Sequence, residues 1–168
     1  YDMYLNEHEL NFWRNMEGAC LAAAAATIDY TNNAALYADC DGSISEDRMI
    51  DLMFMFIYAH PQYYFVSNRI SFAQGYYGVL NIYTAFLNGE ERAAATQQFT
   101  GKVNQWMAEI NAASRPEEKV KIAHDIICLN TVYDWDHNTS LYDQTAYSMV
   151  VEGKTVCAGY AKTMCMLG

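Results

Sequence analysis

The chain has 168 residues, and ten Lys and Arg stand against twenty Asp and Glu, which gives a formal net charge of −10. A hydrophobic fraction of 52%, with 14% aromatic residues and only two prolines, excludes an intrinsically disordered chain, because this much apolar surface is enough to form a core. The few basic residues form no cluster, so we expect no nucleic acid partner. The apolar runs are far shorter than the roughly 20 residues that cross a bilayer, so no transmembrane segment is expected.

Helical patterns fill the first third of the chain. Apolar residues followed by an alanine run predict one long helix within residues 1–30. Ser43 precedes Glu46 by three residues, which is typical of a capping box, and predicts a helix that runs to about Ala59 and ends before Pro61.

The middle of the chain predicts a β-hairpin and a further helix. Residues 63–72 and 77–86 are rich in Tyr, Phe, Val and Ile and are separated by a short Ala-Gln-Gly segment, which predicts two antiparallel strands. Apolar residues spaced by three and four between 88 and 113 predict the next helix.

A second region begins near residue 114. Ser114, Pro116 and Glu117 predict a fresh helix start, and we expect that helix to run to about Asn130. The expected organisation is therefore an N-terminal region, 1–113, and a C-terminal region, 114–168, with a last helix at about 156–167. The fold class is α+β, mostly helical with a β-hairpin.

Several short patterns have simple structural explanations. Asp39, Asp41 and Gly42 partly match a calcium loop, but Arg48 stands where the bidentate carboxylate is needed, so a turn and helix cap are expected. The sequon at Asn138 is interpreted as a chance match. Neither the four dispersed histidines (His8, His60, His124 and His137) nor the five cysteines form a metal-ligand spacing, and no metal or cofactor is expected.

Cys157 is the candidate catalytic residue. A turn through Gly153 leads into an apolar helix with Cys157 in its first turn, where the helix dipole and the free amides favour a thiolate. Ala158 and Gly159 are small enough to let a substrate reach the sulfur, an arrangement suited to acyl transfer. On these residues alone, a buried structural cysteine is the simpler interpretation.

An ordered set of motifs changes that balance. Residues 114–168 resemble the transglutaminase-like superfamily of papain-type folds, above all its bacterial members, and residues 1–113 look like the N-terminal extension that such members often carry. The resemblance implies that Cys157 is the nucleophile of thioester acyl transfer on protein or peptide substrates, as in a transglutaminase, a deamidase or a cysteine peptidase. It also favours a secreted or cell-surface location. The residues that match are Glu118, Lys119, Val120, His124, Asp125, Asn130, Tyr133, Asp134, Gln144, Tyr147, Gly153, Val156, Cys157, Gly159, Tyr160 and Ala161.

The sequence also departs from the family. The family's general-base His and its Asp lie after the nucleophile, whereas none of the eleven residues after Cys157 is His, Asp or Glu. We therefore expect a fragment that ends in the first helices of a truncated papain-like core. The alternative is a noncatalytic transglutaminase-like binding or surface module.

The last helix also carries an expectation about assembly. Its apolar side chains at Val156, Tyr160, Met164 and Leu167 are spaced by four, four and three, as in a stripe that packs on a sheet. Exposing such a stripe to water would be costly. We therefore expect the chain to dimerise, to exchange this helix, or to retain a C-terminal fragment.

Overall fold

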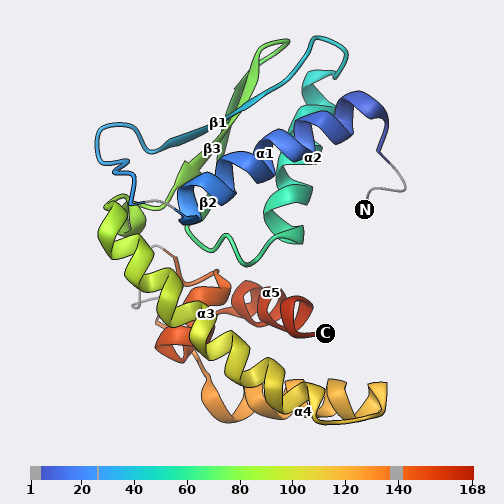
Figure 1. The fold of residues 1–168 in the computed structure, drawn as a ribbon, viewed down its shortest axis with the longest axis vertical. Coiled ribbons are helices and arrows are strands. Elements are labelled where there is room, and N and C mark those ends of the chain that lie inside the picture. Colours follow the sequence, from blue (N-terminus) through green and yellow to red (C-terminus); the bar gives the residue numbers. More distant parts are fainter. Residues whose placement is uncertain (1–4, 26, 137–141) are drawn as a thin grey trace. The chain divides into compact units, whose positions relative to one another are not determined.

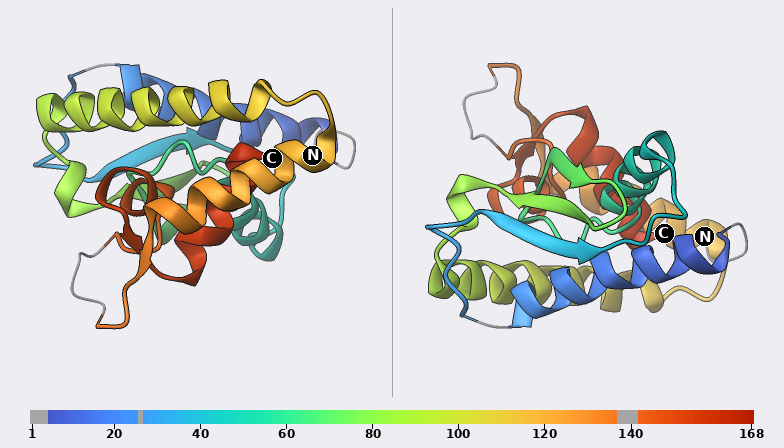
Figure 2. Two further views of the ribbon diagram at one scale, coloured as in Figure 1. Left: turned by 90° about the horizontal axis from the view of Figure 1, so that it is seen from below. Right: turned by 90° about the horizontal axis from the view of Figure 1, so that it is seen from above.

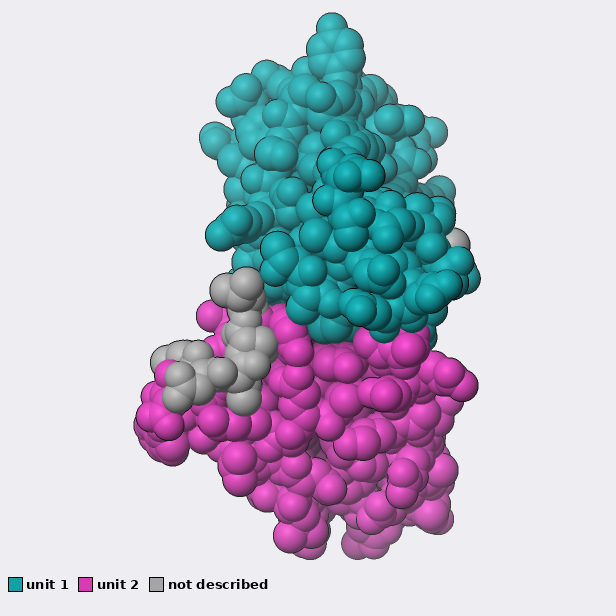
Figure 3. All heavy atoms as spheres, turned by 90° about the vertical axis from the view of Figure 1, so that its left-hand side faces the viewer, with its two compact units in different colours: residues 1–93 teal, residues 94–168 magenta. Residues whose placement is uncertain are grey.

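The computed structural model describes residues 5–25, 27–136 and 142–168, and it confirms a mostly helical α+β fold. The chain divides into two compact units, residues 1–93 and residues 94–168, which Figure 3 colours separately. The sequon at Asn138 and the side chain of His137 lie outside the described residues.

The sheet of unit 1 has three antiparallel strands in the order β1 (Ala35–Asp39), β3 (Tyr77–Ile82), β2 (Val66–Ala73). The hairpin of β2 and β3 confirms the prediction, although the second strand ends at Ile82 and is followed by a short 3-10 helix, Thr84–Phe86. The edge strand β1 was not expected, because its Ala-rich sequence has little intrinsic β propensity.

Two helices of unit 1, α1 (Glu7–Ala25) and α2 (Glu46–Ala59), cover one face of this sheet. Phe12 of α1 and Met53 of α2 both pack against Gly78 of the central strand, so the helices share that face (Figure 1). The expected cap of α2 was wrong by two residues, since Ser45 Oγ accepts the Arg48 amide at 3.4 Å.

A buried arginine joins the ends of the unit 1 helices. Arg92, in the first turns of α3 (Gly89–Asn111), has no exposed surface. Its guanidinium donates hydrogen bonds to the carbonyl oxygens of Ala23, Phe86 and Ile28 at 3.0, 2.9 and 2.6 Å. Burial lowers the pKa of this side chain. These contacts satisfy carbonyls that the end of α1 and the loop before α3 would otherwise bury without partners.

Unit 2 is built mainly from helices. After α3 come α4 (Pro116–Asn130), a short strand β4 (Val132–Tyr133), a π-helical turn at Ser148–Glu152, the strand β5 (Lys154–Thr155) and α5 (Cys157–Leu167). In Figures 1 and 2, α4 and α5 pack side by side. The predicted helix spans are confirmed, but α4 is capped at Arg115 rather than Ser114. The expected boundary at 113/114 falls between α3 and α4, within unit 2.

Candidate functional site

Cys157 is the first residue of α5, and its side chain is exposed. The preceding Val156 has extended backbone angles, and its carbonyl oxygen accepts the amides of Gly159 and Tyr160 at 3.0 and 3.3 Å. Among the described residues, none supplies an acceptor for the amides of Cys157 and Ala158. The thiol therefore stands at the positive end of a helix dipole, beside two amides that can donate to an oxyanion.

A pair of short parallel strands brings the Tyr133-Asp134 segment beside the start of α5. Tyr133 pairs with Thr155, and the Asp134 amide donates to the Thr155 carbonyl oxygen at 2.9 Å. The Asp134 carboxylate is fully buried, and its Oδ1 lies 2.8 Å from Lys154 Nζ. At the turn before β5, Gly153 has φ of +68°, a left-handed conformation that glycine adopts without strain.

Buried hydroxyl groups fix the segment that precedes Cys157. Ser148 Oγ lies 2.8 Å from Thr155 Oγ1 and 3.0 Å from the Asp143 carbonyl oxygen, to which Thr155 Oγ1 donates at 2.5 Å. Thr145 Oγ1 accepts the Ser148 amide at 3.2 Å. Because each hydroxyl is buried and hydrogen-bonded, this cluster ties the π-helical turn to β5 and holds the start of α5 in place.

Gly159, two residues after Cys157, packs closely against the hydroxyl cluster. A Cβ at this position would lie 1.9 Å from Thr155 Oγ1 and 2.9 Å from the Thr145 carbonyl oxygen. Only glycine therefore lets the first turn of α5 sit directly on the hydroxyl cluster. The sequence prediction attributed Gly159 to substrate access, whereas the structure gives it a packing role beneath the helix.

Aromatic side chains flank the first turn of α5. The rings of Tyr133 and Tyr160 are stacked with centroids 6.2 Å apart, and the ring of Trp135 lies 4.6 Å from that of Tyr133. Trp135 is 82% exposed. Burial, followed by the negative charges of Cys128 and Tyr133, raises the pKa of Tyr160. An exposed aromatic surface therefore continues from Tyr160, one turn after Cys157.

No described histidine is hydrogen-bonded to Cys157. His124 is on α4, where Asp125 and Cys128 are its neighbours. His8 pairs with Asp41, and His60 lies among the rings of Trp13, Phe56 and Tyr63 in unit 1. Within the described residues, therefore, no histidine is placed to act as a base on the Cys157 thiol.

The remaining cysteines differ in exposure. All five are free thiols, and Cys128 and Cys165 are exposed like Cys157. Cys20 and Cys40 are buried, and burial raises the pKa of both. Cys165, on the same helix as Cys157 but in its last turn, therefore offers an internal reference for any reactivity that depends on the helix start.

The expected apolar stripe on α5 was wrong in detail. Val156 and Leu167 are buried, whereas Tyr160 and Met164 are half-buried, so none of the four side chains is fully exposed. The buried face of the helix includes Gly159, Lys162 and Thr163 instead, and burial lowers the pKa of Lys162. These four side chains are therefore at least half-buried within the chain itself. Dimerisation, exchange of the helix or a retained C-terminal fragment stays a prediction.

Unit 1 contains a pocket that the sequence did not indicate. Its volume is about 420 Å³, and its lining includes His8, Asn15, Asp39, Cys40 and Asp41. Two aspartates of the partial calcium motif thus face a cavity, but His8 Nδ1 binds Asp41 Oδ2 at 2.6 Å. Within the described ranges, no three His, Cys, Asp or Glu side chains come together as a metal-binding group.

Comparison with known proteins gives no family assignment. No protein-family model matches the chain, and no curated protein matches it. None of the described helices is both long and apolar enough to cross a membrane.

Proposed function

We propose that unit 2 carries the nucleophile of a transglutaminase-like cysteine enzyme, with Cys157 as its catalytic thiol. The single observation that carries this proposal is the placement of an exposed Cys157 as the first residue of α5, beside amides that can bind an oxyanion. The ordered motifs of residues 114–168, which resemble that superfamily, add the reaction class.

The first chemical step forms a thioester. The Cys157 sulfur attacks the carbonyl carbon of a glutamine side chain or a peptide bond, and the amides of Cys157 and Ala158 donate to the developing oxyanion. The carbon–nitrogen bond then breaks, and the nitrogen leaves with a proton as ammonia or an amine. An amine or water next attacks the thioester and releases the thiol. Amine as acceptor makes the enzyme a transglutaminase, whereas water makes it a deamidase or a peptidase.

No described histidine is hydrogen-bonded to Cys157, so this mechanism assigns its general base to no residue of the described chain. In the family the base is a His that follows the nucleophile in sequence and is oriented by an Asp. The buried hydroxyl cluster and Gly159 act earlier, because they fix the backbone on which the sulfur and the amides are presented.

A noncatalytic binding module is the second candidate. The observation that favours it is that no described histidine is hydrogen-bonded to Cys157. A coding sequence that continues past Gly168 with a His and then an Asp would favour the enzyme, and a continuation without them would favour the module.

The test is acyl transfer from glutamine-containing or peptide substrates, followed by amine incorporation, ammonia release and peptide cleavage. If the coding sequence continues past Gly168 with a His and an Asp, we expect turnover from that longer protein, none from residues 1–168 alone, and none from Cys157→Ser in the longer protein. Cys165→Ser is the matched control, and it should keep full activity. Turnover by residues 1–168 alone, or by Cys157→Ser, would contradict the proposal.

A further inference from the structure

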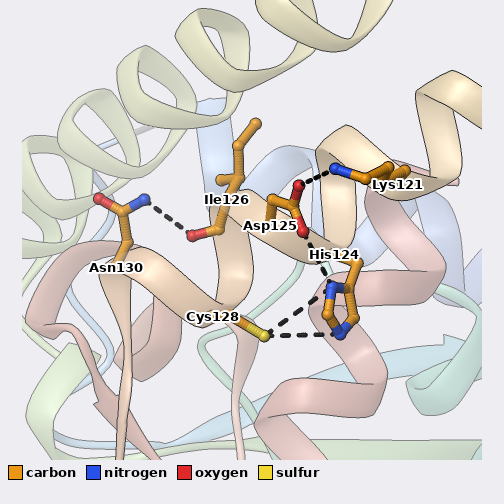
Figure 4. Close-up of polar contacts among 6 residues, drawn as sticks. All are labelled: Lys121, His124, Asp125, Ile126, Cys128 and Asn130. Atoms are coloured by element: carbon orange, nitrogen blue, oxygen red, sulfur yellow. Dashed lines mark hydrogen bonds and ion pairs between the residues drawn. The ribbon is translucent and has the colours of Figure 1, made fainter.

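A second thiol lies against an imidazole on the exposed face of α4 (Figure 4). Cys128 Sγ is 3.5 Å from His124 Nε2, and both side chains are exposed. His124 Nδ1 lies 3.2 Å from Asp125 Oδ1, and Lys121 Nζ binds Asp125 Oδ2 at 2.7 Å. Cys128, His124 and Asp125, called here the α4 thiol site, are distinct from Cys157, which is on α5.

The thiol, the imidazole and the carboxylate lie next to one another on α4. Cys128 Sγ lies 3.5 Å from His124 Nε2 and 4.0 Å from His124 Nδ1, so the sulfur lies beside the ring near both nitrogens, and Asp125 Oδ1 lies near Nδ1. Hydrogen bonds from Lys121 and His124 lower the pKa of Asp125, so its carboxylate is available to accept the Nδ1 proton. In that tautomer Nε2, the ring nitrogen nearer to Cys128 Sγ, is the one that can accept a proton.

Several described side chains surround the α4 thiol site. Besides Lys121, His124 and Asp125 on α4, Tyr160 of α5 faces Cys128, and Tyr133 of β4 stacks on Tyr160. The site is in the last turns of α4. The next residue, Leu129, is 84% exposed, so small molecules can approach the sulfur from solvent.

We propose that Cys128 is a modification site that undergoes thiol–disulfide exchange with small-molecule disulfides, with His124 as its base. The thiol proton passes to His124 Nε2 as the Cys128 sulfur attacks one sulfur of the disulfide. The new bond joins Cys128 to one half of the disulfide, the original sulfur–sulfur bond breaks, and the departing thiolate takes the proton back from His124. Cys128 is oxidised and the departing half is reduced, so no further oxidant is needed. This inference does not rest on acyl transfer at Cys157.

The experiment treats the folded 168-residue chain with oxidised glutathione and follows each cysteine by peptide mapping. Cys165 is the internal reference, because it is also exposed but has no imidazole neighbour among the described residues. We expect Cys128 to form the mixed disulfide roughly tenfold faster than Cys165 near neutral pH. His124→Gln should remove this advantage, and Asp125→Asn should reduce it by a smaller factor.

The pH dependence of the reaction at Cys128 tests whether His124 acts as a base or only lies next to the thiol. The pH dependence of the rate at Cys128 should change in His124→Gln, because the variant keeps the thiol but has no base beside it. His8→Gln is the matched control, since His8 is also bound to an aspartate, and no hydrogen bond joins it to a thiol within the described part of the chain. Circular dichroism verifies that each variant is folded. Equal rates at Cys128 and Cys165, or an unchanged rate in His124→Gln, would overturn the proposal, whatever the outcome at Cys157.

Discussion

Each unit buries backbone carbonyl groups, and the two units supply hydrogen-bond donors to them from different kinds of side chain. In unit 1 a single guanidinium, that of Arg92, donates to the carbonyl groups of Ala23, Ile28, Phe86 and Leu87, at the end of α1 and in the loops around it and before α3. In unit 2 small neutral hydroxyls, those of Ser148 and Thr155, serve the carbonyl of Asp143. The long guanidinium side chain of an arginine can reach carbonyl groups on separate chain segments. The short hydroxyl side chains of Ser and Thr suit segments that pack closely together, as at Gly159.

This difference has a consequence for function. The contacts of Arg92 are enclosed in unit 1, and burying that charge is tolerated only while its carbonyl partners remain. The hydroxyl cluster of unit 2 lies directly beneath the first turn of α5, which presents Cys157 to solvent. The polar core of unit 1 therefore serves stability, and that of unit 2 also positions the candidate nucleophile.

Removal of the Arg92 guanidinium should have the largest effect. We expect Arg92→Met to lower the free energy of unfolding by roughly 3 kcal/mol or more, because four hydrogen-bonded carbonyl groups lose their donor. Urea titration measures the change. Arg14→Met, at an exposed position on α1, is the control and should change stability by about 0.5 kcal/mol or less. A loss of similar size in both variants would contradict the special role of Arg92.

A methyl group at Gly159 should have the next largest effect. In a helix, Gly→Ala ordinarily stabilises by about 0.5–1 kcal/mol, but here the new Cβ would meet Thr155 Oγ1 at 1.9 Å. We expect Gly159→Ala to destabilise the protein by about 1–3 kcal/mol and to slow alkylation of Cys157. Gly101→Ala on α3, where the Cβ has open space, should stabilise it. The same sign in both variants would show that the close contact does not govern the position.

A single hydroxyl of the cluster should matter less. Thr155→Val replaces a buried hydroxyl that bonds to Asp143 and Ser148, and we expect a loss of about 1–2 kcal/mol in the free energy of unfolding. Thr155→Ser restores the hydroxyl and should recover most of that loss. If Thr155→Ser were as unstable as Thr155→Val in urea, the methyl contact rather than the hydrogen bonds would dominate.

The smallest expected effect is a pH dependence in unit 1. Burial lowers the pKa of His60 from its ordinary 6.5, so the unfolded chain takes up this proton first as the pH falls. Stability is therefore present above about pH 6.5 and lost as the pH falls through the folded pKa. His60→Phe should remove this decline between pH 6.5 and 5 in urea titrations. An identical decline in His60→Phe would assign it to other groups. The hydrogen bond from Arg48 lowers the pKa of Glu9 below its ordinary 4.5, so the stability that Glu9 contributes is lost only as the pH falls below about 4.5, outside this window.

The sequence predicts those elements whose signals are local. Repeated apolar spacing marks α3, α4 and α5, and the turn at Gly153 followed by small residues correctly places Cys157 at the start of a helix. The strand β1 has no such local signal, because pairing with β3 rather than its own residues makes it a strand. The cap at Ser45 was missed because Ser43 offered the same spacing, while its amide binds Asp41 instead.

The sites were predictable to different degrees. Cys157 followed from a motif, but the role of Gly159 required the position of Thr155, which only tertiary structure gives. His124 and Cys128 are four residues apart on a predicted helix, so their contact could have been found from the i, i+4 spacing. The burial of Arg92 could not be predicted from the sequence, because a single arginine in a helix is usually solvent-exposed.

The most direct test of the central claim compares Cys157 with Cys165, two exposed thiols on the same helix. Under limiting iodoacetamide near neutral pH, with peptide mapping of all five cysteines, Cys157 should be alkylated several-fold faster than Cys165, because only Cys157 lies at the positive end of the α5 dipole. The buried Cys20 and Cys40 should be slowest, and the lead of Cys157 should persist in His124→Gln. If Cys157 reacted no faster than Cys165 in the folded chain, the start of α5 would not activate its thiol, and the account of Cys157 as a nucleophile would be contradicted.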